Sequence, residues 1–363
     1  MSELTFDVQI ERASAACISH DYDLATKILE NCLKSDPENI RVLSELGRVY
    51  VCAGNDNQAL KYYGRVYELD DQNFNAMNNL GSIFRRLNKN EQSVDILNKA
   101  FAVAPKPVLV HYNLGQTYKA MNRYEDAITE FQAVLDETPQ DVLAHNHLGC
   151  IYAAMGDHES ALNMFGRALL IDENHPILHF NAAVSYEAIG RYNDAAEAYE
   201  NALRKKPGWS EAMQSYAELL QHMGKNDQAE TLLRQAINRT YKNPDLHSSL
   251  GDLLFERERV DDADGEYNVA LSINKDHIKA IGGKVNVLEK KGRSDEAYDL
   301  LMKMEQLVPE DATVSMRCAE LLMNMKNYDE AAEIYYKLLD SHDNETSGIA
   351  YFTLGHIIML STL

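Results

Sequence analysis

Apolar and polar residues are arranged along this chain in a pattern that recurs every 34 positions. When each 34-residue stretch from Phe6 onward is numbered from 1 to 34, apolar residues cluster at positions 4, 7, 8, 11, 20, 24 and 27. Spacings of three and four residues place side chains on one face of an α-helix. The pattern therefore predicts two amphipathic helices in every repeat and an all-α fold.

Two repeat positions hold small residues almost throughout. Position 8 is occupied by Ala13, Gly47, Gly81, Gly115, Gly149, Ala183, Ala217, Gly251, Val285 and Ala319. Position 20 is occupied by Ala25, Ala59, Ser93, Ala127, Ala161, Ala195, Ala229, Ala263, Ala297 and Ala331. A larger side chain would overpack a close contact, so these positions predict where the two helices of a repeat meet.

The helix ends are also marked in the sequence. Position 15 is Gly or Asn in seven repeats, at Gly54, Asn88, Asn122, Gly156, Gly190, Gly224 and Gly292. These residue types tolerate the left-handed conformation that ends a helix, so the first helix is expected to stop there. The eight prolines fall at positions 32, 34 or 1, where they mark the turn into the next repeat or its first helical residue: Pro37, Pro105, Pro107, Pro139, Pro176, Pro207, Pro244 and Pro309.

Ten repeats without insertion account for most of the chain: 6–39, 40–73, 74–107, 108–141, 142–175, 176–209, 210–243, 244–277, 278–311 and 312–345. Residues 346–363 are expected to form the first helix of an incomplete eleventh repeat. A solenoid normally finishes with a polar helix, whereas this stretch ends in Ile-Ile-Met-Leu-Ser-Thr-Leu. We therefore expect either that a longer protein continues beyond residue 363 or that a partner covers this end.

Residues 6–345 resemble the tetratricopeptide repeat family. Repeat four shows the family's small, aromatic and turn positions best, with Leu114, Gly115, Tyr118, Ala127, Phe131 and Pro139. The family's Trp at position 4 is replaced, among others, by Leu43, Met77, His111, His145, His179, Met213 and His247. The resemblance implies a right-handed α-solenoid in which the first helices line an inner groove.

Charge and composition narrow the function. The formal net charge is −21, which disfavours binding to nucleic acids and to anionic membranes. No apolar run reaches the length of about 18 residues that spans a bilayer, and the N-terminus lacks the features of a secretory signal. The five Cys are scattered and form no C-x-x-C pair, which favours a reducing compartment. The cytoplasm is therefore the expected location.

The sequence contains no G-x-G-x-x-G, G-x-S-x-G or H-E-x-x-H motif, and Gly282-Gly283-Lys284 lacks the spacing of a phosphate-binding loop. We therefore expect a protein without enzymatic activity and without cofactor or metal. His145 with His147, or His175 with His179, could in principle chelate a metal. Because His111, His145, His179 and His247 share position 4, which is a packing position, a structural role is the favoured interpretation of these histidines.

Positions 2, 5, 6, 9, 12 and 13 share the other face of the first helix, which in the resembling family lines the groove. In repeats two to four the cations on this face are Arg41, Arg48, Arg85, Arg86 and Lys119, and Glu45 is the only acid. Polar residues beside them are Asn75, Asn78, Asn79, Asn113, Gln116, Asn146 and His147. In repeats six to eight the same face carries Glu187, Glu211, Glu218, Asp245, Asp252 and Glu256. This asymmetry predicts an oriented, charged ligand.

Position 6 is Asn79, Asn113, His147 and Asn181 in four consecutive repeats. An amide both donates and accepts hydrogen bonds, so such a row can hold the backbone of an extended segment. The row is similar to the asparagine ladder in the repeat domain of O-linked N-acetylglucosamine transferases, with His147 interrupting it. The Lys and Asn set with which tetratricopeptide co-chaperones grip a C-terminal carboxylate is not reproduced in any three neighbouring repeats.

The leading hypothesis is a scaffold that binds an extended or acidic segment, or a helix, of another protein along the groove. Its candidate site consists of thirteen residues on this face of repeats two to six: Arg41, Arg48, Asn75, Asn78, Asn79, Arg85, Arg86, Asn113, Gln116, Lys119, Asn146, His147 and Asn181. One alternative is a substrate-recognition arm of a larger enzyme, such as a glycosyltransferase, whose catalytic domain lies beyond residue 363. Another is a scaffold that assembles with itself through its C-terminal end. Solvated helix faces would give the same polar pattern without any ligand.

Overall fold

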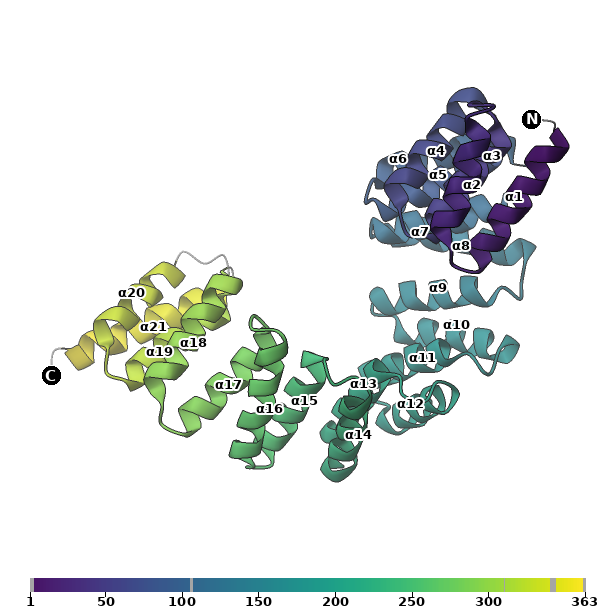
Figure 1. Ribbon diagram of the computed structural model, residues 1–363. Coiled ribbons are helices and arrows are strands. Elements are labelled where there is room, and N and C mark those ends of the chain that lie inside the picture. Colours follow the sequence, from purple (N-terminus) through teal and green to yellow (C-terminus); the bar gives the residue numbers. More distant parts are fainter. Residues whose placement is uncertain (1–2, 105–106, 310, 340–343, 362–363) are drawn as a thin grey trace. The chain divides into compact units, whose positions relative to one another are not determined.

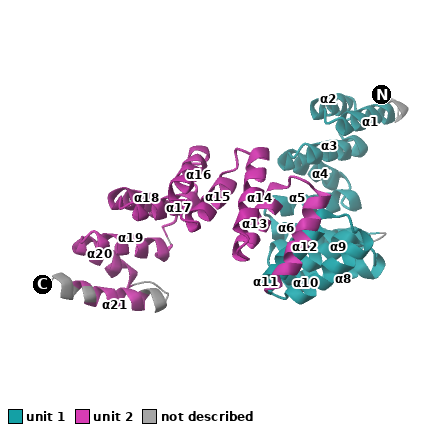
Figure 2. Ribbon diagram, turned by 90° about the horizontal axis from the view of Figure 1, so that it is seen from below, with its two compact units in different colours: residues 1–189 teal, residues 190–363 magenta. Residues whose placement is uncertain are grey.

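The computed structural model describes residues 3–104, 107–309, 311–339 and 344–361 of the chain. Within these ranges it contains α-helices and no strand, in agreement with the sequence-based expectation. The chain divides into two compact modules, which we call the N-terminal module (residues 1–189) and the C-terminal module (residues 190–363), each described by itself (Figure 2).

The helices of the N-terminal module follow one another in antiparallel pairs (Figure 1). They are α1 (Glu3–Ile18), α2 (Tyr22–Leu33), α3 (Ile40–Cys52), α4 (Asp56–Leu69), α5 (Phe74–Arg86), α6 (Asn90–Val103), α7 (Val108–Ala120), α8 (Tyr124–Glu137), α9 (Val142–Ala154), α10 (His158–Ile171) and α11 (Pro176–Ala188).

The C-terminal module continues the same succession of helices. They are α12 (Tyr192–Lys205), α13 (Ser210–His222), α14 (Asn226–Arg239), α15 (Pro244–Glu256), α16 (Val260–Ile273), α17 (Ile278–Lys290), α18 (Ser294–Leu307), α19 (Ala312–Asn324), α20 (Tyr328–Leu338) and α21 (Asn344–Ser361). From α3 to α19, the first helices begin 34 residues apart, at residues 40, 74, 108 and so on to 312.

Each pair of helices meets at the small residues that the sequence singled out. All ten residues at position 20 are fully buried. A Cβ atom added to Gly149 at position 8 would lie 2.4 Å from the ring of Phe165, and one added to Gly81 would lie 2.4 Å from the side chain of Leu97. The two helices are therefore too close for any larger side chain at these glycines.

The turn inside each repeat has one backbone feature in common. Position 15 has a positive φ in all ten repeats: 57° to 81° at the seven Gly and Asn residues, and 61° to 64° at His20, Glu258 and Lys326. The predicted left-handed stop is thus confirmed. None of the seven described prolines lies inside a helix beyond its first residue, which is Pro176 in α11 and Pro244 in α15. Pro105 lies outside the described residues.

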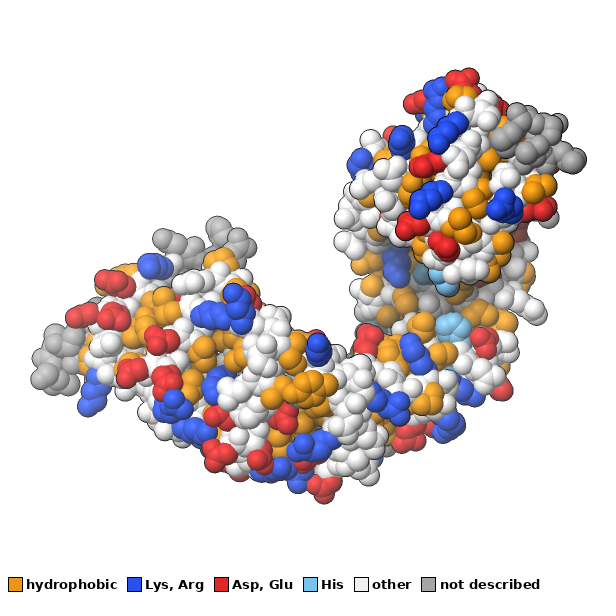
Figure 3. All heavy atoms as spheres, in the orientation of Figure 1, with side chains coloured by type: hydrophobic (Ala, Val, Ile, Leu, Met, Phe, Trp, Pro, Cys, Tyr) orange, Lys and Arg blue, Asp and Glu red, His pale blue; other side chains and the backbone are white. Residues whose placement is uncertain are grey.

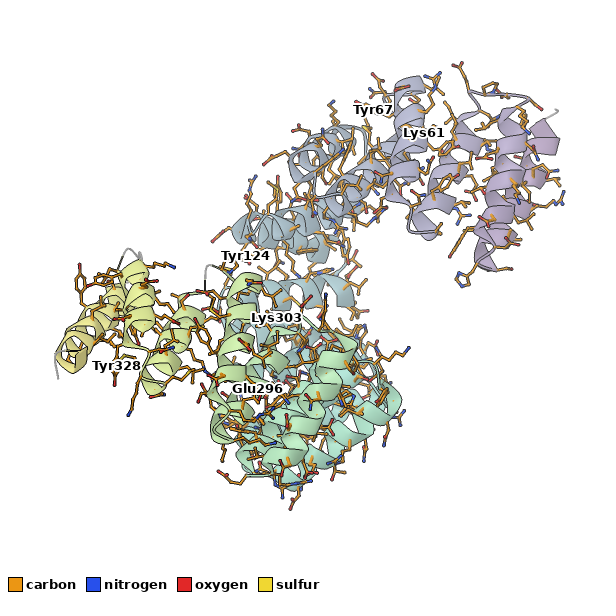
Figure 4. The ribbon with its side chains drawn as sticks, turned by 60° about the vertical axis from the view of Figure 1, so that its left-hand side comes forward. Lys61, Tyr67, Tyr124, Glu296, Lys303 and Tyr328 are labelled. Atoms are coloured by element: carbon orange, nitrogen blue, oxygen red, sulfur yellow. The ribbon has the colours of Figure 1, made fainter. Side chains whose placement is uncertain are left out.

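Many of the helices are preceded by a residue whose side chain caps the free N–H groups of the first turn. Asn39 and Asn73 accept hydrogen bonds from the backbone N–H groups of Val42 and Ala76, and so satisfy donors that the helix leaves free. The second helices often begin with an aromatic residue, as Figure 4 shows for Tyr124 at the start of α8 and Tyr328 at the start of α20. The two helices of each repeat enclose apolar side chains between them, whereas most position-6 side chains of the first helices are half-buried or exposed.

Candidate functional site

The thirteen candidate residues lie on five first helices of the N-terminal module: α3, α5, α7, α9 and α11. With about 100° of rotation per residue, positions 2, 5, 6, 9, 12 and 13 fall within one sector of about 120° on each helix. Each candidate side chain is half-buried or exposed. The space-filling view shows Lys, Arg and His side chains in the recessed part of this module (Figure 3).

Three of the five candidate cations are neutralised by carboxylates of the same module. Arg41 lies 2.6 Å from Asp7 of α1. Arg86 donates from Nε to both oxygens of Asp56, each at 3.0 Å, and Arg48 donates from Nε to Glu45 at 3.0 Å. The sequence count of acids missed Asp7 and Asp56 because one belongs to the preceding repeat and the other to a second helix. The cationic surface is consequently smaller than the sequence predicted.

Arg85 and Lys119 are different, because no described carboxylate lies within ion-pair distance of either one. Arg85 belongs to the last turn of α5, and Lys119 to the last turn of α7. Burial lowers the pKa of Arg85, and the neighbouring charge of Arg86 lowers it further. Its Nε atom is buried and receives no partner from the described residues. We call Arg85, Lys119 and His147 the cationic centre.

His147 completes the cationic centre from α9. Its ring stacks on Phe131, with centroids 4.9 Å apart and planes inclined by 17°, and Tyr112 contacts it edge-on at 5.4 Å. Burial lowers the pKa of His147 to about 4, with smaller contributions from Lys119 and Arg85. The imidazole is therefore neutral near pH 7. Its Nδ1 atom is buried without a partner among the described residues, so the centre contains two unsatisfied polar atoms.

The asparagine row forms links between neighbouring helices. The side-chain amide of Asn113 donates to Oδ1 of Asn78 at 2.8 Å, and that of Asn181 donates to Oδ1 of Asn146 at 2.9 Å. In both cases position 6 of one repeat bonds to position 5 of the repeat before it, 35 residues earlier. Asn79 instead donates to the backbone oxygen of Asn75 within α5, at 2.7 Å.

His147 continues this row, although the sequence suggested that it interrupts it. The hydroxyl of Tyr112 at position 5 and Nε2 of His147 at position 6 are hydrogen-bonded at 2.9 Å, again across 35 residues. In the C-terminal module Gln214 donates to the hydroxyl of Ser249 at 3.1 Å with the same offset. At these four junctions the chemical type varies, but the bond always joins position 5 of one repeat to position 6 of the next.

A second feature of the same face escaped the sequence analysis. Position 2 carries an exposed aliphatic residue in three consecutive repeats, and Leu109, Leu143 and Ile177 are 57%, 51% and 43% exposed. We call these three residues the aliphatic row. Position 2 is Asn75 in the repeat before and Glu211 in the repeat after. The 34-residue spacing of these three aliphatic residues is itself visible in the sequence and is the signal that identifies them.

Three of the acidic residues predicted on this face border a hollow of about 470 Å³ in the C-terminal module. Glu218, Asp252 and Glu256 line it together with Phe255, Tyr267 and Lys279. Lys279 of α17 lies 3.4 Å from Glu218 and 3.5 Å from Asp252, so part of the expected negative charge is balanced by the repeat that follows. Burial raises the pKa of Asp252, which accepts a 2.6 Å hydrogen bond from Tyr267.

The histidines at position 4 hold the preceding turn. Nε2 of His145, His179 and His247 each hydrogen-bonds to a backbone oxygen six residues earlier, at 3.1, 3.0 and 3.1 Å respectively. His111 instead contacts the carboxylate of Glu130 at 2.7 Å. A structural role accounts for these contacts. The described part of the chain contains no group of three His, Cys, Asp or Glu side chains arranged to hold a metal ion.

No helix among the described residues combines the length and the apolar character needed to cross a membrane.

Models of one family match most of the chain. Those described as "Tetratricopeptide repeat" match residues 42–75, 74–107, 112–176, 147–209, 188–253 and 288–350.

Individual relatives cover parts of the chain. It is 29% identical over 155 residues to the type IV pilus assembly protein PilF of Pseudomonas aeruginosa, an alignment that covers 41% of this chain and 61% of the relative. The chain thus spans less than two thirds of that relative's length.

Solved structures share the fold. Yeast Tom70 matches 98% of this chain and 96% of its own, with a TM-score of 0.50 and 16% identity. PilW, a type IV pilus biogenesis factor, matches 59% of this chain and 99% of its own, with a TM-score of 0.55 and 21% identity. A tetratricopeptide repeat protein from Parabacteroides merdae matches 69% of this chain and 98% of its own, with a TM-score of 0.54 and 18% identity. With its repeated helix pairs, small contact positions and family-model matches, this chain belongs to the tetratricopeptide repeat family.

Proposed function

We propose that this chain is a non-enzymatic scaffold that binds another protein on the first-helix face of its N-terminal module. The observation that carries the proposal is the cationic centre. Arg85 and Lys119 have no carboxylate partner among the described residues, whereas Arg41, Arg48 and Arg86 on the same face do. A half-buried cation without a counter-charge is costly, so an acidic group of a partner would relieve that cost.

Related proteins support a scaffolding role. The relative with 29% identity is named as a type IV pilus assembly protein. Repeat folds serve many unrelated processes, so the partner is defined here only by its chemistry, as a segment with acidic side chains. All five cysteines are free, which supports action in a reducing compartment such as the cytoplasm.

The test compares two charge-reversal pairs. Arg85→Glu with Lys119→Glu removes the cationic centre, whereas Lys61→Glu with Lys99→Glu changes the same total charge on the second helices α4 and α6. Lys61 is labelled on α4 in Figure 4. The two variants and the original chain are used for affinity capture from native lysate, after circular dichroism and thermal melting have shown equal folding.

We expect proteins that the original chain and the Lys61/Lys99 variant capture but the Arg85/Lys119 variant does not. Equal capture by all three proteins would place the binding surface elsewhere and would contradict the proposal. A general loss with both variants would show that only overall charge matters, and would contradict it as well.

A further inference from the structure

The aliphatic row, on α7, α9 and α11, shares the helices α7 and α9 with the cationic centre, whose residue Arg85 lies on α5. Leu109 and Lys119 both belong to α7, ten residues apart, so they are separated by about 15 Å along the helix axis. An α-helix with its side chains is about 10–12 Å across. A partner helix laid across α5, α7, α9 and α11 can therefore contact the aliphatic row at one edge, and Arg85 and Lys119 at the other. A single extended strand is narrower than a helix and spans less of this distance.

Several amide groups on this face are already hydrogen-bonded to one another or to their own helix. The amide groups of Asn113 and Asn181 already donate to Asn78 and Asn146, and that of Asn79 donates to its own helix. An extended segment brings backbone N–H and C=O groups that need partners, but a helix arrives with these groups already satisfied. Breaking the links between neighbouring helices to bind a backbone would therefore gain little.

The aliphatic residues themselves require an explanation. Three large apolar side chains exposed at one repeat position form a continuous series, in contrast to single apolar residues scattered over a surface. Burial of such a row against apolar side chains removes it from water, which is favourable. Arg85 and Lys119 would repel a partner whose side chains facing them are basic, so such a partner is disfavoured.

We propose that this face binds an amphipathic α-helix of a partner protein. The helix places aliphatic residues, spaced by three, four and seven positions, against Leu109, Leu143 and Ile177, and its acidic side chains face Arg85 and Lys119. This inference rests on the proposed function, and it adds the secondary structure of the partner and a second, apolar edge to the site.

Two displayed peptide libraries test the inference with the full chain as the target. Both are random at aliphatic and acidic positions. One is built on an alanine-rich helical frame, and the other carries proline at regular intervals so that it stays extended. Binders are then measured by fluorescence anisotropy against Leu143→Asp with Ile177→Asp. The control is Leu170→Asp, a leucine that is 89% exposed on the second helix α10.

Asp at position 2 suits the first turn of a helix, so the double variant should fold, and circular dichroism checks this. We expect binders from the helical library, with affinity weakened about tenfold or more by the double variant and unchanged by Leu170→Asp. Selection of extended peptides only, or of helical peptides that the double variant binds equally well, would overturn the inference.

Failure of the inference and failure of the proposed function give different results. If lysate capture depends on Arg85 and Lys119 but not on Leu143 and Ile177, the scaffold function stands and the amphipathic helix is wrong. If capture depends on neither pair, the first-helix face is not the binding surface and both are wrong.

Discussion

At the scale of single residues, the turn after each first helix imposes the same backbone on ten different positions. Seven of them hold Gly or Asn, but His20, Glu258 and Lys326 also have a positive φ. A side chain with a Cβ atom is strained in that conformation. These three residues therefore hold conformational strain that the other repeats avoid.

Replacing Lys326 by Gly should relieve this strain and raise the free energy of unfolding by about 1 kcal/mol, after the greater freedom of Gly in the unfolded chain is included. Lys326 is exposed and its φ is 64°. Urea denaturation measures the change. Lys326→Ala is the control, because it removes the same side chain but keeps the Cβ atom, and a gain as large as that of Gly would refute the backbone explanation.

Two glycines on neighbouring helices should respond in opposite ways to alanine. At Gly149 the new methyl group would meet the ring of Phe165 at 2.4 Å, so Gly149→Ala should lower stability by about 1–3 kcal/mol. At Gly166, in the middle of α10, nothing lies within 4 Å, so Gly166→Ala should raise stability by about 0.5–1 kcal/mol. Thermal unfolding of both variants measures this difference, and equal effects would argue against the close contact.

At the scale of secondary-structure elements, Glu230 joins three parts of the C-terminal module. It lies on α14 and contacts Arg234 of the same helix, Arg257 after α15 and Arg259 before α16, at 2.9 Å in each case. Burial favours a higher pKa for Glu230, but hydrogen bonds from Arg234 and Arg259 outweigh it, and the pKa falls below its usual value of 4.5. The carboxylate is therefore stabilised in its charged form.

Glu230→Gln should lower the free energy of unfolding at pH 7 by about 1 kcal/mol, because it removes charged hydrogen bonds at a half-buried site where solvent screens the arginines in part. Since the folded pKa is the lower one, the stabilisation is present above about pH 4.5 and is lost as the pH falls through the folded value. Chemical denaturation from pH 3 to pH 7 should show the gap between the two proteins narrowing at low pH. A constant gap would mean that the charge is irrelevant.

The repeat pattern predicts individual elements better than it predicts contacts between them. Positions 8, 15 and 20 act within one repeat, so residues such as Gly149 and Ala161 reveal their roles through spacing alone. The ion pair of Arg86 with Asp56 depends on how a second helix approaches the next first helix, which no single repeat encodes. The link between Tyr112 and His147 depends on the register between neighbouring first helices for the same reason.

At the scale of the whole molecule, stability is distributed along a linear series of repeats. Each helix packs mainly against its neighbours in sequence, so a local defect should stay local. Hydrogen exchange of Gly149→Ala should show weaker protection in α8 to α11, while α15 to α18 keep the protection of the original chain. Uniform loss of protection over both groups of helices would instead indicate one cooperative unit.

The net charge of the whole chain acts on an acidic partner in the opposite sense to the cationic centre. A chain with a net charge of −21 repels an acidic partner at long range, whereas Arg85 and Lys119 attract it once it is close. This combination favours partners that approach with an apolar surface first, and it discourages nonspecific binding of polyanions. Under the proposed function, the aliphatic row and the cationic centre would therefore have complementary roles in selecting a partner.

The links between positions 5 and 6 do not have the same spacing as the repeats themselves. Repeats that arose by duplication resemble one another at an offset of 34 residues, but the side chains that bond are 35 residues apart. The linked pairs are two amides at two junctions, a phenol with an imidazole at a third, and an amide with a hydroxyl at a fourth. Equivalence by repetition and contact between side chains, which share one spacing wherever equivalent positions touch, are therefore distinguished here by one residue of sequence.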